Sequence, residues 1–188
     1  MRKLIVFNHI SLDGYFVDAH GSMARAQMDN NDPEYNAFVA ENASGDGTLL
    51  FGRVTYELMI KYWPTPMAKQ HDPAVAEGMN NMPKFVFSRM MDKASWNNTT
   101  VVKGDPVAEV RKMKEQAGNG MAILGSGTIV SQLAAAGLID EYQVVVNPII
   151  LGKGRTMFES VKNMINLKLT KTRSFKSGKV YVCYEPAV

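Results

Sequence analysis

The feature that most constrains this chain is a strand, glycine turn, helix and strand pattern in its second half. The apolar run at residues 121–124 is followed by Gly-Ser-Gly-Thr at 125–128, and residues 129–137 have helical periodicity up to a closing glycine. Glycine suits the left-handed position that follows a helix end. The β-branched run at 142–146 predicts the second strand. The unit is therefore a parallel crossover, with the glycine turn at the carboxyl end of its first strand.

A glycine turn that leads into a helix is a place for phosphate, because an anion can approach the bare backbone and the unpaired N–H groups of the first turn. A second such junction stands at residues 52–55, Gly-Arg-Val-Thr, which adds a cation and a hydroxyl, and a third predicted strand ends in Ser88 and Arg89. Carboxyl ends of parallel strands collect at one edge of a sheet. We expect the three ends to converge on one ligand with several phosphates, such as a dinucleotide with an extra 2′-phosphate.

The remaining pattern completes an α/β fold. The nearly continuous apolar run at 4–10 predicts a first buried strand, and residues 101–102 predict a short one. Asp-Pro pairs that begin at Asp32 and Asp105 mark two helix starts. Two β-rich runs around a glycine turn at 167–185 predict a hairpin. The sequence therefore predicts a mainly parallel central sheet with an antiparallel C-terminal hairpin at its edge.

Two stretches lack a strong period. Residues 15–31 predict a long loop, of the kind that serves as a lid or binding loop in compact domains. Residues 65–83 predict mostly loop, with a short helix at 75–79. Neither stretch has the composition of a linker, and the length of 188 residues suits one domain over residues 1–188.

Composition limits the class of protein. Hydrophobic residues make up 46% and charged residues 21%, as in an ordinary globular protein, and the formal charge of +3 is too small to argue for nucleic acid. Cys183 is the only cysteine and His9, His20 and His71 are scattered, so we expect neither a disulfide nor a metal site. No run approaches the length of a membrane span, and we expect a cytoplasmic protein without membrane partners.

Two common nucleotide motifs do not fit the glycine turn. Gly125-Ser126-Gly127 has no third glycine at Rossmann spacing, and no acidic residue lies about 20 positions later at a strand end. The turn also lacks the Lys-Ser/Thr pair of a Walker loop. A dinucleotide would have to be bound by another fold.

Several motifs together resemble a known superfamily, and their order matches it over nearly the full chain. They are Ser-Leu-Asp-Gly at 11–14, LFGRVTYE at 50–57, VFSR at 86–89, Gly-Ser-Gly at 125–127, GLIDE at 137–141 and PIILG at 148–152. The chain resembles the dihydrofolate-reductase-like superfamily and, within it, the C-terminal reductase domain of bifunctional riboflavin-biosynthesis deaminase-reductases. The resemblance implies a three-layer dihydrofolate-reductase-like fold.

The same resemblance implies an NADPH-dependent reductase of a small heterocycle, either pterin-like or like the phosphoribosylamino-uracil of the riboflavin pathway. It places the nicotinamide beside residues 8–12. The implied cofactor contacts are Gly52, Arg53 and Thr55 for phosphate and 2′-phosphate, Ser88 and Arg89 for the adenosine end, and Gly125, Ser126, Gly127 and Thr128 for the pyrophosphate. The bulky Tyr15 and Phe16 and the missing deaminase domain depart from the riboflavin enzyme, so the substrate stays open.

Reduction of a C=N bond needs a proton as well as a hydride, and a semi-buried carboxyl with a raised pKa can supply it. Glu34 falls near the acid of dihydrofolate reductases by its spacing from Phe38 and Gly52, while Asp13 belongs to the motif of the riboflavin-type group. The two are rival candidates for the catalytic acid. His9, on a buried strand beside the expected nicotinamide, is interpreted as a hydrogen-bonded core histidine.

Three functions remain open from the residues. The first is the reductase, the second a non-catalytic nucleotide-binding module, and the third a nucleic-acid or nucleotide-binding regulator. The third is the weakest, because Arg53, Arg89, Lys153 and Arg155 belong to glycine turns and do not form a stripe interleaved with aromatics. The resemblance and the apolar run at 148–151 also lead us to expect a homodimer.

Overall fold

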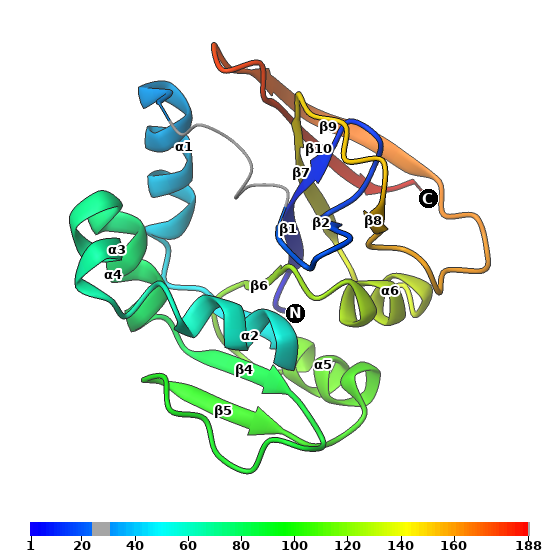
Figure 1. Cartoon of the computed structure of the whole chain (residues 1–188). Coiled ribbons are helices and arrows are strands. Elements are labelled where there is room, and N and C mark those ends of the chain that lie inside the picture. Colours follow the sequence, from blue (N-terminus) through cyan, green and yellow to red (C-terminus); the bar gives the residue numbers. More distant parts are fainter. Residues whose placement is uncertain (24–30, 188) are drawn as a thin grey trace.

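The computed structural model describes residues 1–23 and 31–187. Its centre is an eight-stranded sheet in the order β5-β4-β3-β6-β1-β7-β10-β9 (Figure 1). The first six strands are parallel, and β10 runs antiparallel to both of its neighbours. The strands are β1 Leu4–Ser11, β3 Thr48–Gly52, β4 Lys84–Phe87, β5 Thr99–Val102, β6 Met121–Leu124, β7 Glu141–Asn147, β9 Leu167–Ser174 and β10 Val180–Pro186. The predicted parallel sheet with an antiparallel hairpin edge is confirmed.

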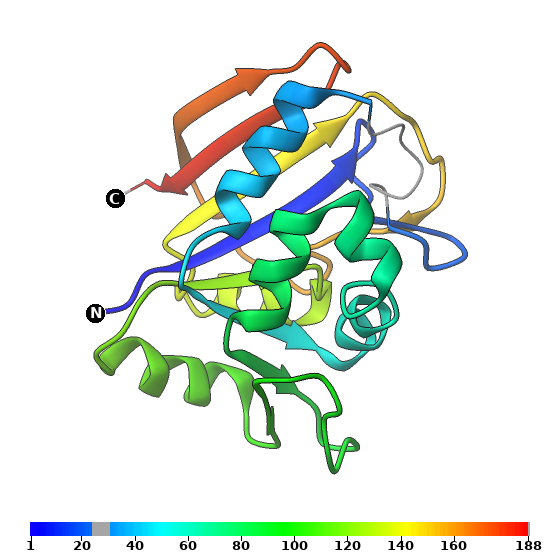
Figure 2. The ribbon, with the colours of Figure 1, turned by 90° about the vertical axis from the view of Figure 1, so that its left-hand side faces the viewer.

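Helices cover both faces of this sheet (Figures 1 and 2). Four helices lie on one face, α1 Pro33–Ala43, α2 Arg53–Ile60, α3 Pro66–His71 and α4 Pro73–Asn81, and two lie on the other, α5 Pro106–Glu115 and α6 Gly127–Ala135. Each face has its own apolar core, because successive strand side chains point to opposite sides. In β3, Leu50 joins the core under α5 and α6, while Leu49 and Phe51 join the core under α1 and α4.

The predicted crossover unit is present, but its two strands are not neighbours. Strand β1 lies between β6 and β7 and pairs with both in parallel. The buried start of β1 is thus held from both sides, and Asp140, just before β7, accepts a hydrogen bond from the Leu4 N–H at 2.7 Å. Cys183 is buried in β10.

The prediction of mostly loop at residues 65–83 is wrong, because α3 and α4 occupy the stretch, but the short helix predicted at 75–79 lies within α4. Each begins with a proline in its first turn, where the missing N–H has no intrahelical acceptor to lose. Thr65 caps α3 by accepting a hydrogen bond from the Ala68 N–H at 3.2 Å. Both helices are short, and tertiary packing stabilises them.

A small two-stranded sheet pairs β2 Val17–Asp18 with β8 Gly154–Arg155. Strand β2 belongs to the predicted lid-like loop at 15–31, of which residues 24–30 lie outside the described part of the chain. Among the described residues, no helix is long and apolar enough to cross a membrane. The same residues contain no group of three or more histidine, cysteine, aspartate or glutamate side chains placed to hold a metal ion.

Candidate functional site

The three predicted phosphate junctions lie at the ends of neighbouring strands. Strands β4, β3 and β6 are adjacent and parallel, so residues 88–89, 52–55 and 125–128 share the carboxyl edge of the sheet. The junctions at 52–55 and 125–128 are joined by two hydrogen bonds. Ser126 Oγ accepts a hydrogen bond from the Gly52 N–H at 2.7 Å, and the Ser126 N–H donates to Thr55 Oγ1 at 2.9 Å. The convergence expected from the sequence is therefore present.

Asn8 joins β1 to the same turn. Its side-chain oxygen accepts from the Gly125 N–H at 2.5 Å and its amide nitrogen donates to the Gly125 carbonyl at 3.2 Å. Asn8 is buried, and β1 lies next to β6 in the sheet. The double hydrogen bond holds the backbone of the turn against the region where the resemblance places the nicotinamide.

Two glycines of the turn are required by close approach. Gly125 has φ +61°, and a Cβ there would lie 2.8 Å from the Thr55 methyl group. A Cβ on Gly127 would lie 2.8 Å from the ring of Phe16, which reaches the turn from the loop after β1. Ser126 between them is also left-handed, with φ 61°. Only a backbone without side chains at both flanking positions fits here.

The predicted cofactor residues divide into internal and exposed groups. The internal residues are hydrogen-bonded or closely packed within the junction, and they are Gly52, Thr55, Gly125, Ser126 and Gly127. Thr128 is exposed in the first turn of α6, where N–H groups lack intrahelical acceptors. Arg53 and Arg89 are exposed as well.

The two arginines differ in their partners. Arg53 Nη1 donates to both carboxylate oxygens of Glu57, at 2.8 and 2.9 Å. Arg89 makes no hydrogen bond or ion pair with the described residues. Beside it, Ser88 Oγ accepts from the Met91 N–H at 3.0 Å. A hollow of about 600 Å³ runs from Ser88 and Arg89 to the side of α6 at Gln132.

A second cavity, of about 310 Å³, lies between the sheet and the helices α1, α2 and α4. Its walls are mostly apolar, with Phe7 from β1, Trp63 after α2 and Met79 from α4 among them. Asn8 and Gly125 line it too. The cavity therefore adjoins the glycine turn, and the two features share one wall.

His9 is the titratable side chain among the described residues that line this cavity. Its Nε2 lies 2.9 Å from the Tyr35 hydroxyl, and its Nδ1 lies 3.5 Å from Asn147 Oδ1. Asn147 Nδ2 donates to the Ile10 carbonyl, so its oxygen faces His9 and favours a proton on Nδ1. The hydrogen-bonded histidine is confirmed, but Tyr35 and Asn147 were missed, because neither residue carries a motif of its own.

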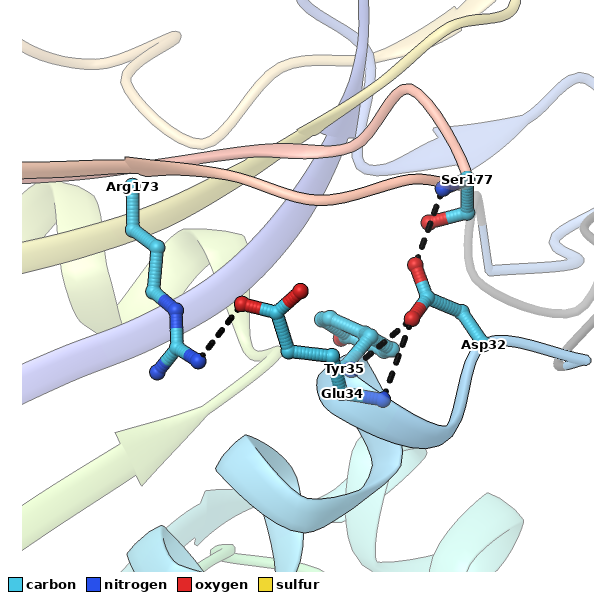
Figure 3. Close-up of polar contacts among 5 residues, drawn as sticks. All are labelled: Asp32, Glu34, Tyr35, Arg173 and Ser177. Carbon is cyan, nitrogen blue, oxygen red and sulfur yellow. Dashed lines mark hydrogen bonds and ion pairs between the residues drawn. The ribbon is translucent and has the colours of Figure 1, made fainter.

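Glu34 does not occupy the semi-buried position expected of it (Figure 3). It lies on the outer side of the first turn of α1, and its carboxylate pairs with Arg173 of β9 at 2.8 Å. The Glu34 side chain keeps 46% of its surface exposed. The next residue, Tyr35, is the one that points inward and is fully buried. The expectation of a semi-buried carboxyl is wrong because the helix places position 34 on its solvent side.

The buried carboxylate of this region belongs to Asp32, the N-cap of α1 (Figure 3). It accepts from the N–H groups of Glu34 and Tyr35 at 3.1 Å each, and from the Ser177 N–H at 2.8 Å. The Ser177 hydroxyl and N–H, followed by the helix N–H groups, lower the pKa of Asp32 to about 2. Among the described residues the hydroxyl has no well-aligned hydrogen-bond partner, so the N–H contact is the directional one. Asp32 thereby fixes α1 to the C-terminal hairpin.

Asp13, the rival acid, serves as a link between loops. Its two carboxylate oxygens accept from the N–H groups of Leu151 and Gly152, at 3.1 and 2.7 Å. A hydrogen bond with the Ser11 side chain, and then these N–H groups, lower the pKa of Asp13. The residue is exposed and does not line the apolar cavity. A carboxylate held in its ionised form is a poor source of protons.

Comparisons with known proteins agree with this geometry. The sequence is 29% identical to uncharacterized protein YyaP of Bacillus subtilis over 187 residues, which cover 97% of this chain and 94% of that protein. The fold resembles a riboflavin biosynthesis protein from Shewanella sp. PV-4, with a TM-score of 0.74, 22% identity and 99% of both chains covered. It also resembles dihydrofolate reductase from Enterococcus faecalis in complex with NADP(H), with a TM-score of 0.69, 17% identity and coverage of 99% and 97%.

These likenesses confirm the dihydrofolate-reductase-like fold over the whole chain. The match to the family described as RibD C-terminal domain covers residues 2–181, which include all three strand-end junctions and the apolar cavity. The chain therefore belongs to the RibD C-terminal domain family.

Proposed function

We propose that this protein is an NADPH-dependent reductase that transfers a hydride to a small heterocyclic substrate. The observation that carries the proposal is the shared wall at Asn8 and Gly125. On one side of it lie the converging strand ends, which suit a dinucleotide, and on the other lies a cavity of about 310 Å³, a size that suits a small ligand. Hydride transfer needs direct contact between donor and acceptor, and the place where the cavity adjoins the strand ends is where the two could meet.

The proposed cofactor runs along the strand ends. Arg89 and Ser88 lie beside the hollow of about 600 Å³, which is large enough for the adenosine end. Arg53 and Thr128 offer a cation and a hydroxyl at the first turns of α2 and α6 for the phosphates. Gly52, Thr55, Gly125, Ser126 and Gly127 would form the backbone shape under the pyrophosphate. When bound, NADPH supplies the hydride.

The proton has a different proposed source from either carboxylate. Glu34 and Asp13 are exposed, paired and outside the described lining of the cavity. His9 lines the cavity and is hydrogen-bonded to the Tyr35 hydroxyl. Lys179 Nζ lies 4.8 Å from the centre of the Tyr35 ring. We assign proton delivery to the His9–Tyr35 pair, with Asn147 as the residue that orients the imidazole.

Calorimetry tests the cofactor assignment. NADPH and NADH are titrated into the protein and into its Arg53→Ala and Arg89→Ala variants, with the exposed Arg111→Ala on α5 as a matched control. We expect NADPH to bind more tightly than NADH, and both site variants to lose about tenfold in NADPH affinity, since each removes a phosphate contact. Equal binding of NADPH and NADH by every variant would contradict the proposed 2′-phosphate site.

A non-catalytic nucleotide-binding module is the second candidate, because the fold alone does not establish chemistry. Oxidation of NADPH in the presence of pterin-like and aminouracil-like acceptors separates the two functions. Tight NADPH binding together with no oxidation by either acceptor class would favour the module. Turnover with one class would establish the reductase and the general type of its substrate.

We also propose that the protein forms a homodimer. Ile150 is 70% exposed and Leu169 on the edge strand β9 is 50% exposed, so both offer apolar surface to a second copy. Light scattering at micromolar concentration tests this assembly. A mass of one chain at every concentration would contradict it.

A further inference from the structure

The apolar cavity is a passage along the sheet and not a pocket at one edge only. At one end it is lined by Asn8, His9 and Gly125, at the carboxyl ends of β1 and β6. At the other it reaches Gly47 and Gly120, just before β3 and β6 begin. On β1 alone the lining extends from Ile5 to His9, which is about 13 Å of strand.

The passage carries no formal charge. Among the described residues that line it there is no lysine, arginine, aspartate or glutamate. Five of the lining residues are methionines, at 23, 59, 79, 82 and 121. Methionine is flexible and polarizable, so walls of this kind adapt to flat apolar ligands. The passage therefore differs from a site built to hold a phosphate or a carboxylate.

Polar side chains lie at both ends of the passage, and one lies between the ends. Asn8 and His9 lie at the end that adjoins the glycine turn, and both are held in place by hydrogen bonds. At the far end, Asn42 on α1 is exposed beside Gly45. Thr48, at the start of β3, is also polar and lies at this end. Between the ends the lining is mostly apolar, as at Phe7 and Met79, and the polar exception is Gln143, whose amide donates to Glu141. A ligand that matches this order has a polar reacting end and an apolar remainder.

We propose that the substrate is an uncharged, flat conjugated ring with an apolar extension, and that it lies along this passage. The ring is placed at Asn8 and His9, and the extension is placed toward Asn42. This inference rests on the proposed reductase function and names its substrate class. A phosphorylated sugar on the ring would bring an anion into a passage without a cation among its described lining residues, and burying an unpaired charge is strongly unfavourable.

Binding of a homologous series tests the passage without any turnover. The probes are 2-alkyl-4-quinolones with methyl, pentyl and nonyl chains, and a nonyl analogue that ends in a carboxylate. We expect about fourfold tighter binding for each added methylene until the passage is filled, because each buried CH₂ contributes a similar increment. The carboxylate analogue should bind at least 100-fold more weakly than the nonyl compound. Affinity that does not depend on chain length, or equal binding of the carboxylate, overturns the inference.

Two variants locate the extension. Asn42→Phe narrows the far end from an exposed helix position, so the fold should tolerate it, and Ala122→Phe fills the passage from β6. Ala108→Phe, exposed on α5, is the matched control. Both passage variants should weaken the nonyl compound at least tenfold and leave the methyl compound within twofold, while the control changes neither. Equal effects on the two chain lengths in folded Asn42→Phe protein would overturn the placement.

The NADPH titration separates this inference from the function on which it rests. NADPH binding without length-dependent quinolone binding removes the substrate class and leaves the reductase. Length-dependent quinolone binding without NADPH binding contradicts the reductase function. The ligand in the passage would then not be the substrate of a reductase. Both titrations positive, with NADPH oxidised more rapidly by longer neutral acceptors, support the inference in full.

Discussion

The strand-end edge and the apolar passage lie on two sides of the same wall, but they are built in different ways. The edge is made of short contiguous motifs, such as residues 52–55 and 125–128, whose backbone shape is the proposed binding surface. The passage is made of single side chains from β1, α1, α4 and β6. Backbone-built sites need particular residues in a row, whereas a side-chain pocket needs only apolar residues of suitable size.

The two regions also differ in what a substitution should do. In the edge, a single methyl group meets backbone or a short rigid side chain, as at Gly125. In the passage, the walls include flexible methionines that can move aside. We therefore expect a substitution in the edge to have a larger effect than a substitution in the passage. The following experiments test that difference.

The largest effect is expected from Gly125→Ala. Alanine at φ +61° is strained, and its Cβ would lie 2.8 Å from Thr55. Together these should lower the free energy of unfolding by about 2–5 kcal/mol. Gly137→Ala is the matched control, because Gly137 has φ +65° but no atom within 4 Å of the added Cβ. It should lose only about 1–2 kcal/mol. Urea denaturation measures both, and equal losses would show that the turn is not tightly packed.

His9→Phe should have the next largest effect, on turnover. Loss of the proposed proton-transferring group is expected to lower the single-turnover rate of hydride transfer about 100-fold. Glu34→Gln and Asp13→Asn should each stay within about threefold of the parent, because their carboxylates are engaged at the surface. A larger loss of rate in either carboxylate variant than in His9→Phe would mean that this carboxyl, and not His9, supplies the proton.

The stability that Asp32 contributes by fixing α1 to the C-terminal hairpin should depend on pH. The pKa of Asp32 is about 2, below its ordinary value of 3.8, so the folded protein binds fewer protons than the unfolded chain between these values. Its stabilising contribution is present above about pH 4 and is lost as the pH falls toward 2. Asp32→Asn should flatten that part of the stability curve, as measured by urea denaturation between pH 6 and 3. Asn in place of the exposed Asp46 should leave the curve unchanged.

The smallest effect is expected at the Arg53–Glu57 pair. Both residues are exposed, so Glu57→Gln should change stability by less than about 0.5 kcal/mol. It should release the guanidinium and tighten NADPH binding about twofold, with the gain fading at high salt. Calorimetry at two salt concentrations measures this change. Weaker NADPH binding in the variant would mean that Glu57 positions Arg53 and does not compete for it.

The parts predicted from the sequence are those with local chemical signals. Glycine and proline report backbone conformation directly, so the junctions at Gly52 and Gly125 and the start of α1 at Pro33 were found without any tertiary information. The convergence of the three strand ends followed from a general property of parallel sheets. The helix α3 was missed and α4 was predicted too short, at 75–79, because each is short and is stabilised by burial against other elements.

The candidate site was predicted unequally for the same reason. Arg89 and Thr128 could be named from motifs, and both are exposed at the expected strand ends. Glu34 was placed on the wrong side of its helix, since spacing along the chain gives the turn but not the direction in which a residue faces. Tyr35, one residue later, faces His9 across 26 positions of sequence. No local pattern encodes such a pair.

The sequence by itself determined the α/β fold, the parallel sheet with its hairpin edge, and the glycine turns at the strand ends, because backbone conformation and hydrophobic period depend on neighbouring residues. Only the tertiary structure decided which side chains share a space. It brought Asn8 to Gly125, Tyr35 to His9, and the methionines of separate elements into one passage. Those contacts arise from packing between elements, whose relative positions depend on the whole chain at once.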